Sequence, residues 1–354
     1  METPLPSSPT SPSFPRRLGL LVLAALIALV TGEVTARIYD LLRYDMPMWT
    51  AQSMQTLVFR DSLTIRGLPE GRYKQFVLDR YGFRGPEIDS LPTPGCTRVM
   101  ALGASETFGF TESDGKNYTA QLADSLRRHG CYEVINAGIM GITGPNLIRF
   151  WNLWASRFRP SIVVVYPTPK FYLDDPAPSP LSPQRPHILA RPPWWHSRLW
   201  DHLHDRIVIP PAIQAWRTRR ALARATAGRP ASWFFTEVPR DRMEAFGRDL
   251  DSLVQTIRST GALPVVVAHA TRYGRTLSEN DQRILLGWRL LTPRATAEAT
   301  LAFEVGAEAT IHDIADRRRV PLADADHAMT GHSDYFVDSQ HFTDQGAAVL
   351  AGLI

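Results

Sequence analysis

The chain has 354 residues, enough for one α/β domain with further segments, and its apolar fraction of 44% is that of a globular protein. Lys and Arg outnumber Asp and Glu by 39 to 35, but the excess is spread over loops and helices, which disfavours a nucleic-acid-binding protein. The sequence has no glycine-rich phosphate loop with a lysine and no Cys/His cluster with metal-ligand spacing, so we expect neither a cofactor nor a metal.

The N-terminus combines a Pro/Ser-rich tail with an apolar segment. Residues 1–17 are expected to form a disordered cytoplasmic tail. The unbroken apolar run Leu18–Thr31 is short for a complete span, but the helix can extend to about residue 38. Two arginines precede it, which predicts a single-pass signal anchor at 18–38 in the cell inner membrane, with the rest of the chain extracytoplasmic, or periplasmic. Alternatively, Val34–Ala36 is a signal-peptide cleavage site and the protein is secreted.

Two further segments flank or interrupt the main domain. A spacer at 39–94 contains strand-like fragments such as Tyr73–Leu78 and is expected to pack against the domain. An insertion at about 176–228 is rich in Pro, Trp and Arg, and its middle, His196–Ile209, has the pattern of an amphipathic helix. That helix either packs on the domain, or forms a flap that covers the site or leans on the membrane.

Short apolar runs alternate with helical patterns between about residues 95 and 354. Strands are expected at about Arg98–Leu102, Tyr132–Ile135, Ser161–Tyr166, Leu263–Ala268 and Val320–Asp324. Helices are expected at about Asn117–Arg128, Pro145–Phe158, Met243–Thr260 and Pro293–Arg318. This alternation predicts a doubly wound parallel sheet.

A serine follows the first of these strands. Ser105 lies in a stretch bounded by Gly103 and Gly109, at the carboxyl end of the strand, where open α/β sheets bind their ligands. Taken alone, this pattern favours a Ser105 that merely caps the next turn. Near the C-terminus, however, Asp338 and His341 lie on one short loop. A hydroxyl, an imidazole and a carboxylate are the three parts of an activated serine nucleophile.

With these blocks, the region from about Thr97 to Ile354 resembles the SGNH hydrolases, also called the GDSL esterase/lipase family. The resemblance implies a flavodoxin-like three-layer α/β/α sandwich. It also implies that Ser105 is the nucleophile, with His341 as its base and Asp338 as the carboxylate that orients the imidazole. The segment Asn136–Gly141 is similar to the family's second block, which makes the backbone N–H groups of Ser105 and Gly141 the expected oxyanion hole.

The sequence departs from the family pattern at two positions. Ala104 replaces an aspartate that mostly supports the turn. The third block, normally Gly-x-Asn-Asp, is replaced by residues 166–170, so the asparagine that donates to the oxyanion is missing. Thr168 is the first candidate to replace it, with Tyr166 and Lys170 as alternatives. Losing such a donor costs roughly 10²–10³ in rate, so a slow enzyme is one expectation.

The two cysteines occupy equivalent positions in the first two strands. Cys96 precedes Gly103 by the same distance as Cys131 precedes Gly138. The resembled fold makes these strands parallel neighbours, which predicts a Cys96–Cys131 disulfide in an oxidising compartment. Two buried free thiols are the alternative.

Together these features predict a membrane-anchored, extracytoplasmic serine esterase that needs no cofactor. Its partners would be the lipid bilayer, through the N-terminal helix, and an ester whose acyl group is carried by a glycan, a lipid or a small molecule. One alternative is an O-acyltransferase or acetyl esterase acting on an exported polysaccharide. Another is a catalytically weak SGNH-like protein that binds glycan or serves as a scaffold.

Overall fold

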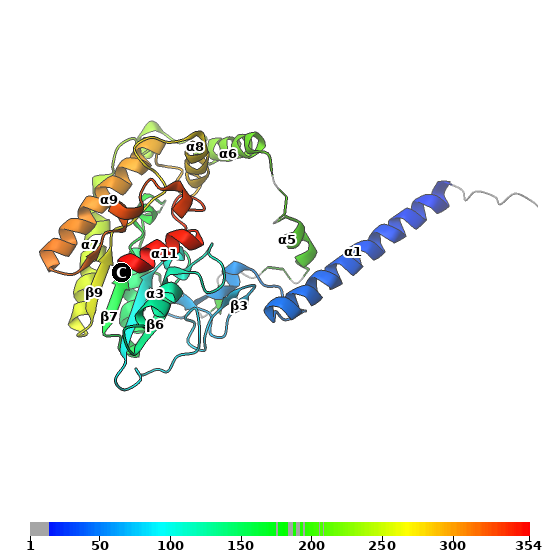
Figure 1. Cartoon of the computed structure of the whole chain (residues 1–354). Helices are drawn as coiled ribbons and strands as arrows, with labels where there is room; N and C mark the ends of the chain where they lie inside the picture. The colour runs from blue at the N-terminus through cyan, green and yellow to red at the C-terminus, as the bar shows by residue number, and fades with distance from the viewer. Residues whose placement is uncertain are drawn as a thin grey trace, which may run out of the picture. The chain divides into compact units, whose positions relative to one another are not determined.

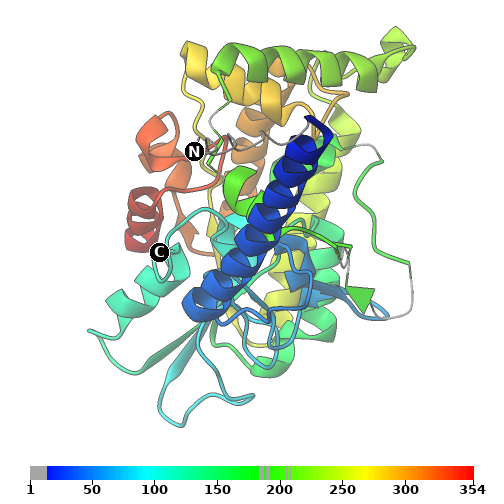
Figure 2. The same cartoon turned by 90° about the vertical axis from the view of Figure 1, so that its right-hand side faces the viewer.

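A computed structural model describes residues 14–174, 176–182, 187–188, 192–193, 195–204, 206–207 and 209–354 (Figure 1, Figure 2). The chain divides into two compact units, which are described separately. One comprises Met1–Ala51 and Pro192–Val208, and the other comprises Gln52–Arg191 and Ile209–Ile354. Residues 1–13 of the expected tail lie outside the described residues, whereas 14–17 are helical rather than disordered.

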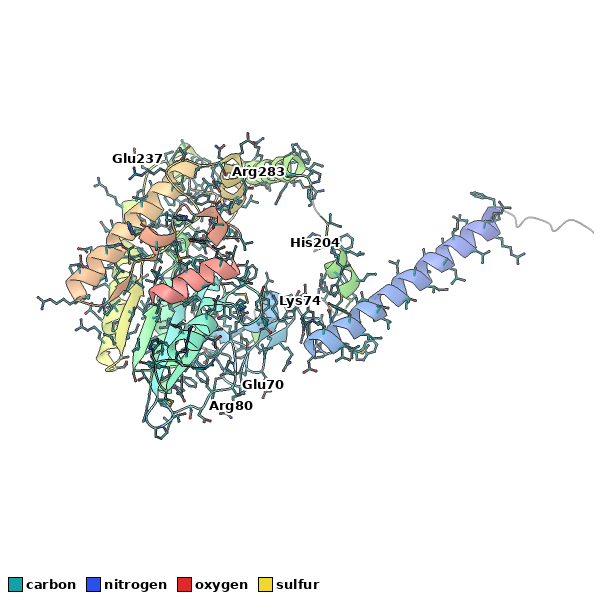
Figure 3. The ribbon with its side chains drawn as sticks, viewed as in Figure 1. Glu70, Lys74, Arg80, His204, Glu237 and Arg283 are labelled. Carbon is teal, nitrogen blue, oxygen red and sulfur yellow. A yellow bond between two sulfur atoms is a disulfide. The ribbon has the colours of Figure 1, made fainter. Side chains whose placement is uncertain are left out.

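The first unit is built on one long apolar helix. Helix α1 (Phe14–Tyr44) has 31 residues, and its most apolar 18-residue window has a mean hydropathy of 2.2 with no buried side chain. Side chains stand out on all sides of this helix (Figure 3). At about 1.5 Å per residue the helix exceeds the roughly 30 Å of a bilayer core. It is therefore long and apolar enough to cross a membrane or to serve as a signal sequence, and it continues beyond the predicted end at residue 38.

A short helix, α5 (Arg198–His204), packs against the polar end of α1. It is shorter than the helix expected at His196–Ile209. The Glu33 carboxylate accepts hydrogen bonds from the Ser197 hydroxyl at 2.7 Å and from the backbone N–H of Leu199 at 3.0 Å. The buried Asp40 carboxylate lies 2.8 Å from His202 Nε2. The Glu33 carboxylate of α1 therefore accepts hydrogen bonds at the start of α5, and the Asp40 carboxylate bonds a side chain on its face.

The second unit is built on a five-stranded parallel sheet. Its strands are β5 (Thr97–Gly103), β6 (Tyr132–Gly138), β7 (Ile162–Val165), β9 (Leu263–Val267) and β10 (Leu322–Ala323). Their spatial order is β10-β9-β7-β5-β6, and every pairing is parallel. This is the flavodoxin-like order, in which the sequence direction reverses between β5 and β7. The predicted fold class is confirmed.

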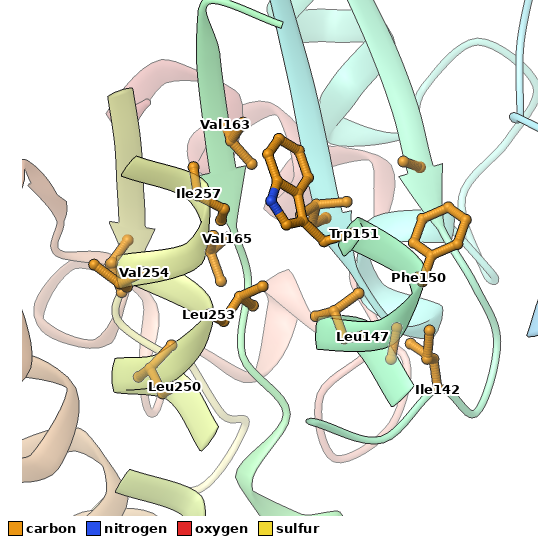
Figure 4. Close-up of a cluster of buried hydrophobic side chains, with 14 of the residues drawn as sticks. Ile142, Leu147, Phe150, Trp151, Val163, Val165, Leu250, Leu253, Val254 and Ile257 are labelled. Carbon is orange, nitrogen blue, oxygen red and sulfur yellow. The ribbon is translucent and has the colours of Figure 1, made fainter. Parts of the chain in front are cut away.

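Helices cover both faces of the sheet (Figure 1). One layer contains α4 (Gly144–Leu153), α7 (Arg240–Ser259) and α9 (Ala297–Arg318), and the other contains α3 (Tyr118–Leu126), α10 (Ala325–Met329) and α11 (Asp344–Leu353). Because side chains alternate along a strand, Met100 and Leu102 face the first layer while Val99 and Ala101 face the second. Figure 4 shows the first core, where α4 and α7 pack against β7.

The spacer from Gln52 onward belongs to this second unit. It contains η1 (Met54–Leu57), β1 (Val58–Arg60), β2 (Ile65–Gly67), β3 (Arg72–Tyr73) and β4 (Phe76–Val77), and β8 (His187–Ile188) pairs with β1. Lys74 marks the turn between β3 and β4 (Figure 3). Leu57, Phe76 and Leu78 form a core cluster with Phe108 of α2 (Ser105–Phe108). The spacer therefore packs against the helix that follows β5.

Several element boundaries differ from the sequence expectation. The helix expected at Pro145–Phe158 is divided into α4 and η2 (Ala155–Phe158), and α9 begins after a Thr296 cap rather than at Pro293. The remaining elements are α6 (Pro211–Thr226), α8 (Glu279–Trp288), η3 (Pro169–Leu173), η4 (Ala231–Trp233) and η5 (Ser333–Tyr335). Helix α8 was not expected, and it contributes to the site described next.

Candidate active site

Ser105 is held on a single helical turn directly after β5. It is the first residue of α2, beside the point where the strand order reverses. A side chain at Gly103 would place its Cβ 2.1 Å from Thr107 Oγ1, so only glycine allows this close approach. Gly109 ends the turn with φ +78°, in the left-handed region. The two glycines therefore fix where the serine leaves the sheet.

His341 and Asp338 meet Ser105 from the C-terminal loop. His341 Nε2 lies 2.8 Å from Ser105 Oγ, and His341 Nδ1 lies 2.7 Å from Asp338 Oδ2. The other carboxylate oxygen, Asp338 Oδ1, accepts from the backbone N–H groups of Gln340 and His341 at 3.1 and 3.0 Å. The structure thus brings the three residues singled out in the sequence into one hydrogen-bonded chain. The partners of the Ser105 hydroxyl are side chains.

The electrostatics of Asp338 keep it charged. Burial is the largest single influence and favours the protonated form. The hydrogen bonds from the His341 ring and from the backbone N–H groups of His341 and Gln340 outweigh it and hold the pKa of Asp338 below its ordinary value. A carboxylate at this position stabilises a protonated imidazole and fixes the tautomer that donates from Nδ1.

Sequence reasoning missed four neighbours of this chain. The Ser105 hydroxyl also lies 3.1 Å from Glu106 Oε2, and the buried Gln340 amide donates to Glu106 Oε1. The rings of Phe110 and Trp288 lie 5.2 and 5.9 Å from the imidazole of His341. The only sequence signal for Glu106 was its position directly after the serine. Phe110 and Trp288 belong to no sequence motif, and the fold alone brings them to His341.

Gly141 and Thr168, both expected at the oxyanion hole, follow the strands β6 and β7. Gly141 lies in the loop after β6 with φ +73°, and at the start of that loop the Ile139 N–H donates to the carbonyl of Gly103, the last residue of β5, at 3.0 Å. Thr168 directly precedes η3 and lines a small cavity of about 30 Å³ with core residues of α4 and α7. Ser105, His341 and Asp338 do not line that cavity.

The two alternatives to Thr168 are placed very differently. The Tyr166 ring is fully buried, and its hydroxyl accepts from the backbone N–H of Ala270 at 3.3 Å, so it is engaged elsewhere. The buried Lys170 ammonium lies 3.6 Å from the centre of the Trp288 ring, which in turn contacts His341. Burial lowers the pKa of Lys170 to about 8, although the charges of Glu106, Glu304 and Asp338 oppose this. Lys170 is therefore a cation among the acidic groups of the site.

A second buried carboxyl group lies near the imidazole. Burial raises the pKa of Glu112 to about 7, against the opposing effects of backbone hydrogen bonds, Arg84 and His341. One oxygen, Oε2, accepts from the Thr111 N–H at 3.0 Å, while Oε1 has no hydrogen-bond partner. Glu112 therefore changes its charge near neutral pH.

The cysteines lie at the opposite end of the sheet. Cys96 and Cys131 form a disulfide with a Cα–Cα separation of 4.6 Å, just before the paired residues Thr97 and Tyr132 of β5 and β6. The bond ties the amino ends of the two strands whose carboxyl ends lead to Ser105 and Gly141.

Comparisons with known proteins gave structural matches only. No family model and no curated protein matches the sequence. A lipolytic protein of the G-D-S-L family from Desulfitobacterium hafniense DCB-2 is 11% identical, with 73% of this chain and 97% of that chain covered and a TM-score of 0.40. A catalytic mutant of an acetylxylan esterase from Geobacillus stearothermophilus (13%; 73% and 91%; 0.41) and the lipase/acylhydrolase from Enterococcus faecalis (14%; 73% and 92%; 0.42) also match. These identities are too low for a residue's role to be carried over.

Proposed function

We propose that the chain is an SGNH-type serine esterase that hydrolyses acyl esters through Ser105, His341 and Asp338. One observation supports this above all others: the unbroken contact from the Ser105 hydroxyl through both nitrogens of His341 to Asp338, at 2.8 and 2.7 Å. Distances of this size are those at which a base takes a proton from a hydroxyl. The position of the serine at the carboxyl end of β5 agrees with the site of ligand binding in flavodoxin-like sheets.

In the proposed first half-reaction, Ser105 Oγ attacks the ester carbonyl carbon while its proton passes to His341 Nε2. The carbonyl oxygen becomes negative, and Asp338 stabilises the imidazolium that forms. His341 then gives the proton to the leaving alcohol as the carbon–oxygen bond breaks. The alcohol departs and the acyl group remains as an ester on Ser105.

In the second half-reaction, water attacks the acyl group. His341 Nε2 takes the proton from water and returns it to Ser105 Oγ as the acid is released. We assign the backbone N–H groups of Ser105 and Gly141 to the oxyanion in both steps. Of the three side chains considered as the missing donor, Lys170 is the best supported, because its ammonium lies beside the aromatic ring that contacts His341.

We further propose that α1 is retained as an inner-membrane anchor, with the hydrolase unit extracytoplasmic. The helix runs without a break through Val34–Ala36, the segment considered for cleavage. Cleavage there would remove Glu33, which bonds Ser197 and the first N–H groups of α5. Intact mass and membrane fractionation test this: a chain that begins near residue 37 in the soluble fraction would contradict it.

The activity is tested with the full-length chain in detergent. Chromogenic acetyl, butyryl and longer-chain esters should be hydrolysed, and a fluorophosphonate probe should label Ser105. Labelling that persists in Ser105→Ala, or an unlabelled wild-type protein that is folded, would contradict the proposal. Transfer of a radiolabelled acyl group to a polysaccharide in preference to water would instead indicate an acyltransferase.

A further inference from the structure

Ser105, His341 and Asp338 are not among the lining residues of a second polar cavity. Its volume is about 490 Å³, within the size range of small-ligand sites. It lies between the segment after β9, the helix α9 and the start of α10. Three acidic residues line it, Glu304 and Glu308 from α9 and Asp326 from α10, together with His269 after β9. The activity proposed above does not use this cavity.

Several buried atoms of this cavity lack a hydrogen-bond partner. His269 is fully buried and Glu308 is 9% exposed, yet both ring nitrogens and both carboxylate oxygens are unpaired. The backbone amide of His269 faces Glu308 without reaching hydrogen-bond geometry. His269 Nδ1 lies 3.1 Å from Glu304 Oε2, but these two atoms also fail that geometry. Such groups cost free energy unless something that enters the cavity satisfies them.

The charge of the lining selects for a cation. Three carboxyl groups line the cavity, whereas Arg275 is the cation that its described lining residues provide, and Lys170 also acts on Glu304. Among the described residues, no group of three His, Cys, Asp or Glu could hold a metal ion. An ammonium group offers three donors on one centre, which matches carboxylate and imidazole acceptors that are spread around a wide space.

We propose that this cavity is a second binding site, which takes a small organic cation with a primary ammonium group, of the size of an amino sugar. The ammonium would bind between Glu304 and Glu308, with His269 Nε2 accepting a further hydrogen bond. Thr271 and Tyr273 line the same cavity, and because the Tyr273 hydroxyl already bonds Ser339 Oγ, Thr271 is the residue that would serve a hydroxyl group of the ligand. The site does not depend on the esterase proposed above.

The state of Glu308 gives this proposal a distinctive signature. Burial and the nearby charges of Asp326 and Glu304 raise the pKa of Glu308 to about 10, so the empty cavity holds a protonated Glu308 at neutral pH. A cation bound next to it favours the carboxylate. Binding should therefore release a proton, which calorimetry in two buffers of different ionisation enthalpy detects.

The experiment is a calorimetric titration of the full-length chain in detergent with glucosamine, in a mildly acidic buffer that keeps its amine charged. Glucose is the matched neutral ligand. We expect saturable binding of glucosamine with proton release, and none of glucose. Glu304→Gln and Glu308→Gln should each weaken binding roughly 10- to 100-fold, as expected for the loss of a charged acceptor. Asp313→Asn, on an exposed part of α9, is the matched control and should bind as the wild type does.

A second variant separates loss of binding from loss of folding. Val305 lines the cavity and is 73% exposed, so Val305→Trp should block entry without changing a charge. No binding to a folded wild-type protein, equal affinity in Glu308→Gln, or binding of MgCl₂ or MnCl₂ in place of glucosamine would each overturn the proposal. Ester hydrolysis measured on the same samples reports on Ser105 separately, so failure of one proposal is distinguished from failure of the other.

Discussion

Two polar clusters lie among the loops that follow the strands, and they use their hydrogen bonds in opposite ways. In the first, the Ser105 hydroxyl, the His341 ring and the Asp338 carboxylate all bond one another or nearby backbone. In the second, the buried side chains of His269 and Glu308 make no hydrogen bond, although His269 Nδ1 lies 3.1 Å from Glu304 Oε2. An unsatisfied buried polar group costs about 1–3 kcal/mol. The first cluster is therefore organised before any substrate arrives, whereas the second offers buried polar atoms to a molecule that enters the cavity.

The strongest way to break the first cluster is to remove its hydroxyl or its base. Ser105→Ala and His341→Ala should each lower kcat for a chromogenic acetyl ester by roughly 10³–10⁶, and the double variant should be no worse than either single one. The fold should persist, because neither residue belongs to the apolar core clusters on the two faces of the sheet. Ser259→Ala, on the exposed end of α7, is the control and should keep wild-type activity. A Ser105→Ala protein that retains most activity would refute the assignment.

Removing the charge of Lys170, at the edge of the first cluster, should have the next largest effect on kcat. If Lys170 replaces the missing donor, Lys170→Met should lower kcat by roughly 10²–10³. Thr168→Val should have less effect, and Tyr166→Phe should have none, because the Tyr166 hydroxyl is engaged by Ala270. Steady-state rates with one acetyl ester decide the order. Three unchanged rates would mean that backbone N–H groups alone form the oxyanion hole.

The disulfide tests whether the active cluster depends on the far end of the sheet. Replacing Cys96 and Cys131 by serine should lower the free energy of unfolding by about 4 kcal/mol, from the chain-entropy cost of opening a loop with a sequence separation of 35. Activity per folded molecule should be unchanged, since the bond lies at the amino ends of β5 and β6. Urea unfolding and rates on the same samples measure both. Mass spectrometry that finds both thiols alkylated in the unreduced protein would contradict the bond.

In its hydrogen bonding, Glu112 is intermediate between the residues of the two clusters, because one of its carboxyl oxygens is bonded and the other is not. Its pKa is raised from 4.5 to about 7 in the folded chain, so the folded state holds this proton where the unfolded state has lost it. Its contribution to stability is therefore present below pH 4.5 and is lost as the pH rises through 7, by at most about 3 kcal/mol. Glu112→Gln should gain stability relative to the wild type across this range. A difference in the free energy of unfolding between the wild type and Glu112→Gln that is the same at all pH values would contradict the raised pKa.

The smallest effects should differ in sign between the two clusters. Glu106→Leu removes the acceptor of Gln340 and should destabilise the protein by about 1–3 kcal/mol. Glu308→Leu removes a buried group without partners and should be neutral or stabilising by a similar amount. Urea unfolding of both variants in the absence of ligand makes the comparison. Destabilisation by both would mean that Glu308 is satisfied in the empty protein.

The sheet and the meeting of Ser105, His341 and Asp338 could be predicted from the sequence because each depends on short local patterns. The apolar run at β7 marks a strand covered on both faces, and its neighbours repeat the pattern. Ser105 and the Asp338–His341 loop were found through short sequence motifs, which can be recognised in a single sequence. The parallel strand order then brings the loops that carry these blocks to one edge of the sheet.

The rest of the site depends on contacts between distant segments. Trp288 reaches His341 from a helix that the sequence did not reveal, and Lys170 was considered without any sign of which aromatic ring it would meet. The cavity was missed for a different reason. Glu304 and Glu308 are spaced by four on a helix, a pattern that normally marks a solvated face. Here that face of α9 lies against the segment after β9.

The contact between α1 and α5 has a practical consequence for preparing this protein. Truncating the chain after Tyr44, the usual way to obtain a soluble enzyme, would remove Glu33 and Asp40 together with the apolar helix. The segment 192–208 would remain, with the first N–H groups of α5 and the ring of His202 deprived of their acceptors. A soluble version should therefore also omit or shorten that segment, or keep the polar half of α1 on a water-soluble leader.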